Sequence, residues 1–439
     1  MRSLAVVGSG ISGLSVAHAL AGERRVTLFE AGAWFGGHTH TVDLELDGIV
    51  HGVDTGFLVF NERTYPNLIR LFGELDVEVT ASEMSFSVQA REDGIEWSGT
   101  NLNALFSQRG NLLRPRFWAM LADLRRFNRI ATALAEQKAE DGNGELQEPI
   151  GDFLSRHAFG DAFRHWYLLP MLGCIWSCPT DQMLRFPLAT LVRFCHNHGL
   201  LQLTNRPRWF TVPGGARQYV NKMLRPLRDA RLNTPVRSVR RLPAASGEAG
   251  VMVQTDAGSE RFDDVVLACH SDQSLALLAD ASPAERALPG AIRYQPNRAL
   301  LHTDTRLLPT HQRAWAAWNY ERAEGLVQGA AESAAVCLHY LLNRLQPLPW
   351  KRPVIVSLNP ARAPRDESVH AEFNYAHPVF DQAAIDAQAR LPDLQGRAHT
   401  WFCGAWTGYG FHEDGLKSGL ALVQALREQA GEGEARDAA

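Results

Sequence analysis

The hydrophobic pattern near the N-terminus alternates between two kinds of segment. Leu4-Ala5-Val6-Val7 is a continuous apolar run, typical of a strand buried on both faces, and residues 25–29 are predicted to form a second strand. Between them, residues 14–21 have the apolar spacing of a helix. This strand–helix–strand order predicts the beginning of a parallel α/β sheet.

The pattern changes several times further along the chain. Residues 41–46 and 49–53 alternate as two strands around an Asp47-Gly48 turn, and residues 65–75 have helical spacing. A long amphipathic helix is predicted over 115–138, and residues 150–210 read as mostly helical. Apolar strands follow at 264–269, 299–304, 354–358 and 400–403, the last leading into a helix that we expect to begin at Gly415. The predicted fold class is therefore α/β.

The loop after the first strand has the composition of a dinucleotide-binding turn. Residues 8–13 read Gly-Ser-Gly-Ile-Ser-Gly, a G-x-G-x-x-G motif between a strand and a helix. Gly8 permits the tight turn, Gly10 allows the backbone to approach a pyrophosphate, and Gly13 allows close helix–strand packing. Glu30 ends the second strand, where it can accept hydrogen bonds from a ribose diol. The loop, with Ser9, Ile11 and Ser12 included, is a predicted cofactor site.

The residues after Glu30 extend this motif. Glu30-Ala31 is followed by Gly36-Gly37-His38-Thr39, which resembles the extended fingerprint of flavoproteins. The chain is similar to the superfamily of flavin amine oxidases, phytoene desaturases and protoporphyrinogen oxidases. Within it, the chain is most similar to the bacterial proteins described only as predicted NAD/FAD-binding. The resemblance implies FAD as cofactor, with the paired glycines returning the backbone to the pyrophosphate.

The same resemblance assigns sites in the rest of the chain. It places Gly56 near the flavin ring and the valine at 236 beside the adenine. The segment from Gly404 to Gly415 and Leu416 is similar to the second FAD signature of the superfamily, in which a helix N-terminus faces the pyrimidine side of the flavin.

The resemblance also implies a divided domain organisation. We expect a Rossmann-like FAD/NAD(P)-binding domain of the GR2 flavoprotein type from residues 1–76, 211–270 and 399–439. An interleaved α+β substrate-binding domain is expected from residues 77–210 and 271–398. The specific motifs lie at the two ends of the chain, and the middle matches mainly in layout.

The amino-acid composition limits which kinds of molecule the protein is expected to bind. The formal net charge is −4, so no global basic field favours nucleic acid. The six cysteines are scattered rather than arranged as a disulfide framework, which indicates a reducing cytoplasm. The Cys174-x-x-x-Cys178 spacing matches no recognised zinc pattern, so no metal is predicted. Arg114-Pro115-Arg116-Phe117-Trp118 mixes cations with aromatic residues, and we expect a cytoplasmic protein with peripheral membrane contact as a further option.

Several reactions fit a flavin held in this way. Amine oxidases of the superfamily often carry a Tyr three positions before the helix-opening glycine, where this chain has His412, and a lysine near flavin N5. None of the four lysines lies in a matching motif. We therefore expect a small, apolar, fatty-acyl or isoprenoid-like substrate that is oxidised or desaturated, with oxygen or a quinone as electron acceptor. Amine oxidation and redox-neutral isomerisation remain alternatives, and so does a prenyl-protein binding module without cofactor, although the intact glycine motifs argue against it.

Histidines supply the candidate acid–base groups. His38, His40, His51 and His412 have side chains that titrate near neutral pH, and each has a structural or pyrophosphate-side role as its alternative. His412 is the predicted catalytic residue because it lies beside the second FAD signature.

Overall fold

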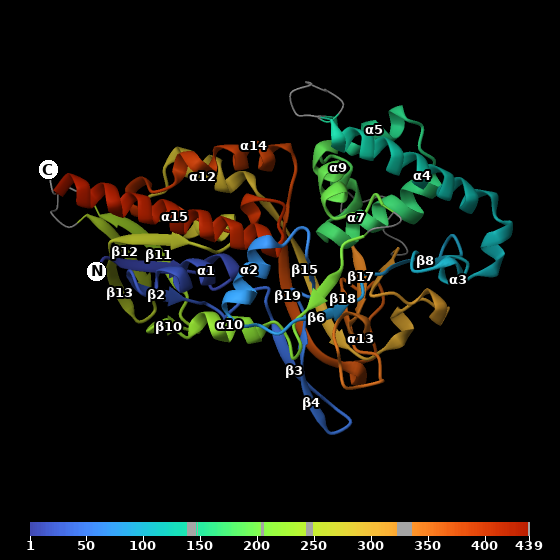
Figure 1. Ribbon diagram of the computed structural model, residues 1–439, viewed down its shortest axis with the longest axis horizontal. Coiled ribbons are helices and arrows are strands. Elements are labelled where there is room, and N and C mark those ends of the chain that lie inside the picture. Colours follow the sequence, from blue (N-terminus) through green and yellow to red (C-terminus); the bar gives the residue numbers. More distant parts are fainter. Residues whose placement is uncertain (138–145, 147, 203–205, 243–248, 323–335, 438–439) are drawn as a thin grey trace.

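The chain folds into two lobes built around two large sheets (Figure 1). A computed structural model describes residues 1–137, 146, 148–202, 206–242, 249–322 and 336–437. One lobe contains a five-stranded parallel sheet with both chain ends beside it, and the other contains a seven-stranded mixed sheet covered by helices. The fold class predicted from the sequence is confirmed.

The parallel sheet has the strand order β10-β2-β1-β14-β20. Successive residues of β1 point to opposite faces, so Leu4 and Val6 enter one core while Ala5 and Val7 enter another. This two-sided burial explains the continuous apolar run in the sequence. The strands are β1 Ser3–Val7, β2 Arg25–Phe29, β10 Asp229–Arg231, β14 Asp264–Leu267 and β20 Thr400–Phe402.

Helices cover one face of the parallel sheet, and a small antiparallel sheet with further helices covers the other. On the first face lie α1 Ile11–Leu20, α2 Pro66–Glu74, α10 Arg217–Leu224 and α15 His412–Asp437. On the second lie β11 Val236–Leu242, β12 Gly250–Thr255, β13 Gly258–Phe262, α11 Ser271–Leu277, α12 Pro283–Ala287 and α14 Gln382–Arg390.

The mixed sheet has the strand order β19-β15-β18-β17-β16-β7-β8. Only β16 and β7 pair in parallel, and the other neighbours are antiparallel. The strands are β7 Phe86–Ala90, β8 Ile95–Ser98, β15 Arg293–His302, β16 Trp318–Glu321, β17 Cys337–Leu341, β18 Ile355–Leu358 and β19 Val369–Val379. It shares one large aromatic and aliphatic core with the helices that cover it.

These helices come mainly from one stretch of the chain (Figure 1). They are α3 Leu102–Leu105, α4 Pro115–Glu136, α5 Ile150–Arg156, α6 Asp161–Phe163, α7 Leu169–Trp176, α8 Thr180–Met183 and α9 Leu188–Asn197. The short α13, Leu342–Leu345, follows β17. Among the described residues, no helix is both long enough and apolar enough to cross a membrane.

Two small sheets join the lobes. The predicted hairpin is present as β3 Thr41–Leu46 and β4 Ile49–Asp54, and the chain crosses between the lobes through β5 Phe60–Asn61, β6 Thr80–Ser82 and β9 Trp209–Thr211. The division into residues 1–76, 211–270 and 399–439 against 77–210 and 271–398 stays our proposal. It is supported by the origin of the strands, since the parallel sheet draws all five from the first set.

Candidate active site

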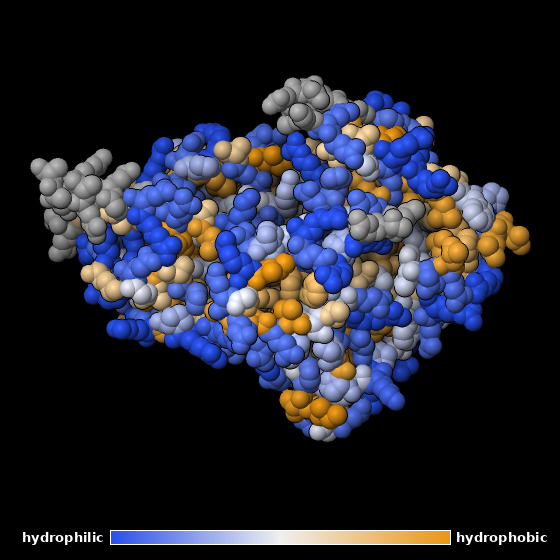
Figure 2. All heavy atoms as spheres, in the orientation of Figure 1, coloured by the Kyte–Doolittle hydropathy of each residue, from blue (hydrophilic) through white to orange (hydrophobic). Residues whose placement is uncertain are grey.

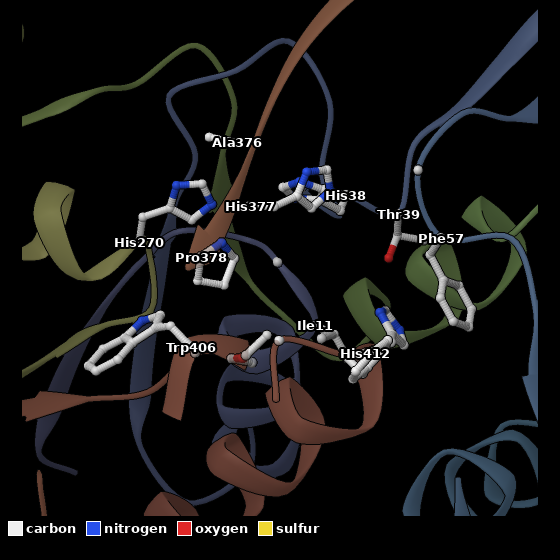
Figure 3. A pocket seen from close by; sticks show the side chains of 18 of the residues that line it. Ile11, His38, Thr39, Phe57, His270, Ala376, His377, Pro378, Trp406 and His412 are labelled. Atoms are coloured by element: carbon white, nitrogen blue, oxygen red, sulfur yellow. The ribbon is translucent and has the colours of Figure 1, made fainter. Parts of the chain in front are cut away.

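A cavity of about 820 Å³ lies where the ends of the parallel strands meet the mixed sheet (Figure 3). Its walls come from both lobes, including β1, β2 and α1 on one side and β16, β17 and β19 on the other. The cavity brings together these residues expected at the cofactor: Gly8, Ser9, Gly10, Ile11, Ser12, Glu30, Ala31, Gly36, Gly37, His38, Thr39, Gly56, Val236 and Gly404. His412 also lines it, whereas Gly13, Gly415 and Leu416 do not.

The glycine loop has the geometry that its sequence predicts. Gly8 has a φ of +101°, a left-handed conformation that favours glycine. A Cβ on Gly13 would lie 1.9 Å from the Gly8 carbonyl oxygen, so only glycine fits between α1 and the turn. A Cβ on Gly10 would meet no protein atom within 4 Å and would project into open space. The loop therefore leaves room for a ligand beside Gly10, where α1 begins without a side-chain cap.

Glu30 holds this loop in place from the end of β2. One carboxylate oxygen accepts hydrogen bonds from the Ser9 backbone N–H at 3.0 Å and from the Ser9 hydroxyl at 2.5 Å. The other oxygen accepts from the Gly32 N–H at 2.7 Å. The carboxylate thus stands in the cavity wall with the loop bound to it.

The paired glycines pack directly on the loop. Gly36 donates its N–H to the Ser9 carbonyl and to the Ser9 hydroxyl, each at 3.1 Å. A Cβ on Gly37 would lie 3.2 Å from the Gly10 Cα. A Cβ on Gly56 would lie 2.2 Å from the His38 carbonyl oxygen, so the segment after β4 supports this turn from behind. Three glycine segments far apart in the sequence therefore meet at one wall.

Both helices that frame the loop begin three residues earlier than their patterns predict. α1 begins at Ile11 rather than Leu14, and α15 begins at His412 rather than Gly415. The expectation that Gly415 opens the helix was therefore wrong. A Cβ on Gly415 would lie 2.8 Å from Ile11 Cγ2, and one on Gly419 would lie 2.0 Å from the Ser15 hydroxyl. These glycines, four residues apart on one helix face, let α15 pack closely against α1.

His412 stands at the first residue of α15 and is held on two sides. Its Nε2 is 2.7 Å from the Tyr219 hydroxyl, which is also 2.7 Å from the Thr39 hydroxyl. Its ring stacks on Phe57 with 3.9 Å between the centroids. Burial and the neighbouring His38 lower the pKa of His412 to about 3, so the ring is neutral at ordinary pH. The catalytic role of His412 stays a prediction, and Tyr219 and Phe57 are the groups that position its ring.

The other two candidate histidines have structural partners. His40 Nδ1 lies 3.0 Å from the Tyr375 hydroxyl and 3.1 Å from the Thr55 hydroxyl, and the ring stacks on Trp34. His51 lies on the β3–β4 hairpin, with Nδ1 2.9 Å from the Gly52 carbonyl. Neither lines the cavity.

Sequence reasoning missed His270 and His377, which line the cavity, as well as His198 at its apolar end. His270 follows β14, and His377 lies on β19, which comes from the opposite lobe (Figure 3). Their rings lie 6.0 Å and 5.3 Å, centroid to centroid, from His38. No local pattern marks His377, because it reaches the cavity through the pairing of β19 with β15. For His270, the position just beyond a buried parallel strand was the available signal.

The remainder of the cavity is an apolar chamber under the helices. Its walls carry thioether, aliphatic and aromatic side chains: Met84, Phe86, Met171, Ile175, Phe194, Leu200, Trp209, Trp318, Tyr340 and Phe411. No lysine and no arginine is present among the described lining residues, and Glu30 is the one carboxylate there. Lys222 instead donates to the Leu75 and Asp76 carbonyls. The cavity thus joins a glycine-walled end to an apolar end.

A buried polar cluster lies outside this cavity. The ligand atoms of Glu321, Cys337 and His339 lie within 4.8 Å of one another, and His339 Nε2 is 3.0 Å from a Glu321 oxygen. The other Glu321 oxygen accepts from Arg91 at 2.8 Å. The carboxylate is therefore already balanced by cations, and the cluster functions as an ion-pair network of the mixed sheet. Cys174 and Cys178 of the Cys174-x-x-x-Cys178 segment are both buried.

The residues present fit an FAD dinucleotide. Open space beside Gly10, an uncapped helix start and a carboxylate at the end of β2 match the diphosphate and ribose of such a ligand. The buried His38 Nε2 has no hydrogen-bond partner within the described part of the chain, which leaves it available to a ligand. The apolar chamber continues the same cavity and offers space for a substrate.

Comparison with known proteins agrees with this geometry. The family model for flavin containing amine oxidoreductases matches residues 11–333. Among solved structures, a fatty acid isomerase from P. acnes that produces CLA has a TM-score of 0.67 at 16% identity, over 97% of this chain and 98% of that one. A putrescine oxidase with bound putrescine has a TM-score of 0.67 at 15% identity, over 97% and 99%.

Cyclohexylamine oxidase from Brevibacterium oxydans IH-35A has a TM-score of 0.65 at 15% identity, over 98% of this chain and 99% of that one. No curated protein sequence matches the chain. The solved structures share the fold, and the family match covers more than half of the residues. The chain therefore belongs to the family of flavin-containing amine oxidoreductases and is an FAD-dependent oxidoreductase.

Proposed function

We propose that this enzyme oxidises a lipid-like substrate, a fatty-acyl or isoprenoid chain, as a desaturase or dehydrogenase. The observation that carries the proposal is the apolar chamber at the far end of the cofactor cavity. Its walls contain methionine, leucine, phenylalanine and tryptophan side chains, and it has no carboxylate of its own among the described residues. Transfer of an alkyl chain from water into such a chamber is favourable. A buried ammonium group, in contrast, would lack a counter-charge there.

The chain's residues have three tasks in this reaction. The glycine loop and Glu30 hold the dinucleotide, and the chamber aligns an alkyl segment beside it while excluding water. The neutral His412 is held in place by Tyr219 and Phe57. It therefore restricts the positions that the cofactor and the substrate can take relative to each other. FAD, when bound, would supply the acceptor for a hydride from one carbon, the proton from the adjacent carbon would pass to solvent, and oxygen or a quinone would serve as the final oxidant.

Product analysis separates the proposal from its alternatives. The FAD-loaded enzyme is incubated aerobically with an unsaturated fatty acid, and the recovered acid is analysed by mass spectrometry. We expect a product that has lost two hydrogen atoms. A product of unchanged mass with a moved double bond would instead make the enzyme a redox-neutral isomerase, the activity by which the P. acnes neighbour is named. An aldehyde formed from an added primary amine would favour amine oxidation.

We further propose that the tip formed by α3 and the start of α4 contacts a membrane surface. Leu102, Leu113 and Trp118 are exposed there by 75%, 88% and 49%. Figure 2 shows hydrophobic residues gathered at this end of the molecule, near the label α3 in Figure 1. Arg109, Arg114 and Arg116 lie in the same segment, and residues 97–122 contain no acidic side chain. This combination fits a bilayer that contains anionic lipids.

Exchanging Leu113 for glutamate tests this contact. Since burial of a leucine side chain contributes about 1.5–3 kcal/mol, L113E is expected to weaken binding to phosphatidylglycerol vesicles about tenfold or more in a co-sedimentation assay. Val79 is another exposed aliphatic residue, 41% exposed, outside this tip, so V79E is the matched control and should bind like the wild type. Equal binding by L113E and the wild type would rule out the tip as the docking surface.

A further inference from the structure

The FAD cavity contains no fixed cation among the residues that the structure describes. Neither lysine nor arginine lines it, while Glu30 contributes a negative charge. The diphosphate of FAD brings two further negative charges into this buried space. Burying charge without compensation is costly, and the α1 N-terminus supplies only a partial positive charge. The positive charge has to come from groups that gain a proton.

Histidines are the groups in the lining that can supply it. His38 directly follows the Gly37 that packs on Gly10, so its ring lies beside the dinucleotide loop. His270 lies two residues after Ala268, whose Cβ would be 3.1 Å from a Cβ on Gly13 and whose backbone meets Gly8. His377 approaches from β19, 5.3 Å from His38. Figure 3 shows these three rings on one side of the cavity.

His38 differs from the other members of this group in its hydrogen bonding. The His38 side chain is half-buried, but its Nε2 is buried and has no hydrogen-bond partner within the described ranges. A buried imidazole nitrogen without a partner is rare, because it loses its hydrogen bond to water without replacement. A bound ligand that forms this hydrogen bond would explain the unpaired Nε2 of His38.

The tautomer of His377 is set by a chain of amides. Asn359 accepts from the Arg298 N–H at 2.8 Å, and its Nδ2 donates to the Asn297 side-chain oxygen at 2.7 Å. Asn297 Nδ2 in turn donates to His377 Nδ1 at 2.8 Å. Because Nδ1 accepts, the proton of the neutral ring is on Nε2. His377 is therefore held as an N–H donor beside His38.

We propose that His38, His270 and His377 form a histidine cradle that binds the FAD diphosphate, and that His38 takes up a proton when FAD binds. This proposal depends on FAD as the cofactor and is independent of the substrate. The Nε2 of His38 is the one found without a partner among the residues described, and the His38 ring lies 6.0 Å from that of His270 and 5.3 Å from that of His377. Its protonated ring would place a full positive charge and a new N–H donor beside the phosphates, as arginine does in other anion sites.

Without FAD, the cradle is neutral. Burial and repulsion from His270 and His40 lower the pKa of His38 to about 4, and burial lowers the pKa of His270 to about 4 and that of His377 to about 3. The titratable groups around His38 are His40 in its own segment, His270 after β14, and Tyr375 and His377 on β19. His412 at the start of α15 also interacts with it. The two negative charges of the diphosphate would raise the histidine pKa strongly at this point.

Uptake of a proton on FAD binding determines the direction in which the FAD affinity changes with pH. FAD binding with uptake of one proton tightens as the pH falls, and the Kd rises about tenfold per pH unit above the free histidine pKa until the pH passes the pKa of the bound state. The FAD-loaded, full-length protein is diluted at a series of pH values between about 6 and 8, and the fluorescence of released FAD gives the Kd. We expect this slope for the wild type, and a flat profile with weaker binding for His38→Gln.

A calorimetric measurement on the wild type and a control variant keep the proposal testable if H38Q folds poorly. Calorimetry with ADP-ribose, which carries the diphosphate without the flavin, is expected to show uptake of about one proton in buffers of different ionisation heat. His198→Gln is the control, because His198 lines the chamber against Phe194 and Phe411, and it should keep the wild-type slope. A wild-type Kd that is independent of pH, or the same slope in H38Q, H270Q and H377Q, would overturn the proposal.

Discussion

Replacing Gly13 by alanine is expected to abolish FAD binding and to destabilise the FAD-binding lobe. The new Cβ would lie 1.9 Å from the Gly8 carbonyl oxygen and 3.1 Å from the Ala268 Cβ, and these two residues directly follow β1 and β14. Neither can move without shifting β1 or β14. We expect the free energy of unfolding to fall by about 3 kcal/mol, and the displaced α1 to lose the loop geometry that receives the diphosphate.

The measurement is a denaturant melt together with the visible flavin absorbance of the purified variant. Gly73→Ala is the matched control, because Gly73 lies within α2 and an added Cβ there meets nothing within 4 Å. It should gain about 0.5–1 kcal/mol from helix propensity and keep its flavin. A G13A protein with normal flavin content and a normal melt would show that the close contact is not needed.

Replacing Asp54 by alanine is expected to loosen the junction between the lobes. Asp54 is buried, and its carboxylate accepts hydrogen bonds from the Ala216 N–H at 2.9 Å, from the Thr41 hydroxyl at 2.5 Å and from the Gln346 amide at 2.6 Å. These partners belong to the α10 start, to β3 and to the segment after α13. Removing the acceptor leaves two buried donors and the half-buried Thr41 hydroxyl unpaired, and we expect the free energy of unfolding to fall by about 3 kcal/mol or more.

Thermal melts monitored by circular dichroism and by flavin fluorescence check this expectation. The control is Asp256→Ala, which removes a fully exposed carboxylate paired with Arg237 and should leave the midpoint unchanged. Since Asp54 lies outside the cavity lining, D54A should lose flavin at a lower temperature without a changed flavin spectrum before melting. A D54A melt identical to that of D256A would contradict the bridging role.

The parts of the site that depend on local sequence were predicted well. Gly8, Gly10 and Gly13 have the conformations and packing that the motif requires, because a strand, a turn and a helix in succession leave little freedom. The helix starts were placed three residues late, since Gly13 and Gly415 were read as lying before or at the first turn. Both lie inside helices, where Gly13 packs against the Gly8 backbone and Gly415 against the Ile11 and Ser12 side chains.

The parts that depend on contacts between distant segments were not predictable in the same way. His377 reaches the cavity on the long strand β19, and its tautomer is set by Asn297 and Asn359 from two other segments. Leu416 was assigned to the cofactor by resemblance, yet its side chain is fully buried in the core between α1 and α15. The residue type indicates which chemistry is available, whereas the pairing of strands decides which histidines meet.

The central claim is that an FAD-dependent oxidoreductase acts here on a lipid-like chain, and anaerobic flavin titration tests it most directly. The purified protein is titrated without oxygen, first with an unsaturated fatty acid and then, in a fresh sample, with a primary amine, while the visible flavin bands are recorded. We predict that the bands bleach with the fatty acid, persist with the amine, and return when oxygen or a quinone is added. Bleaching by the amine alone would contradict the account and make the enzyme an amine oxidase.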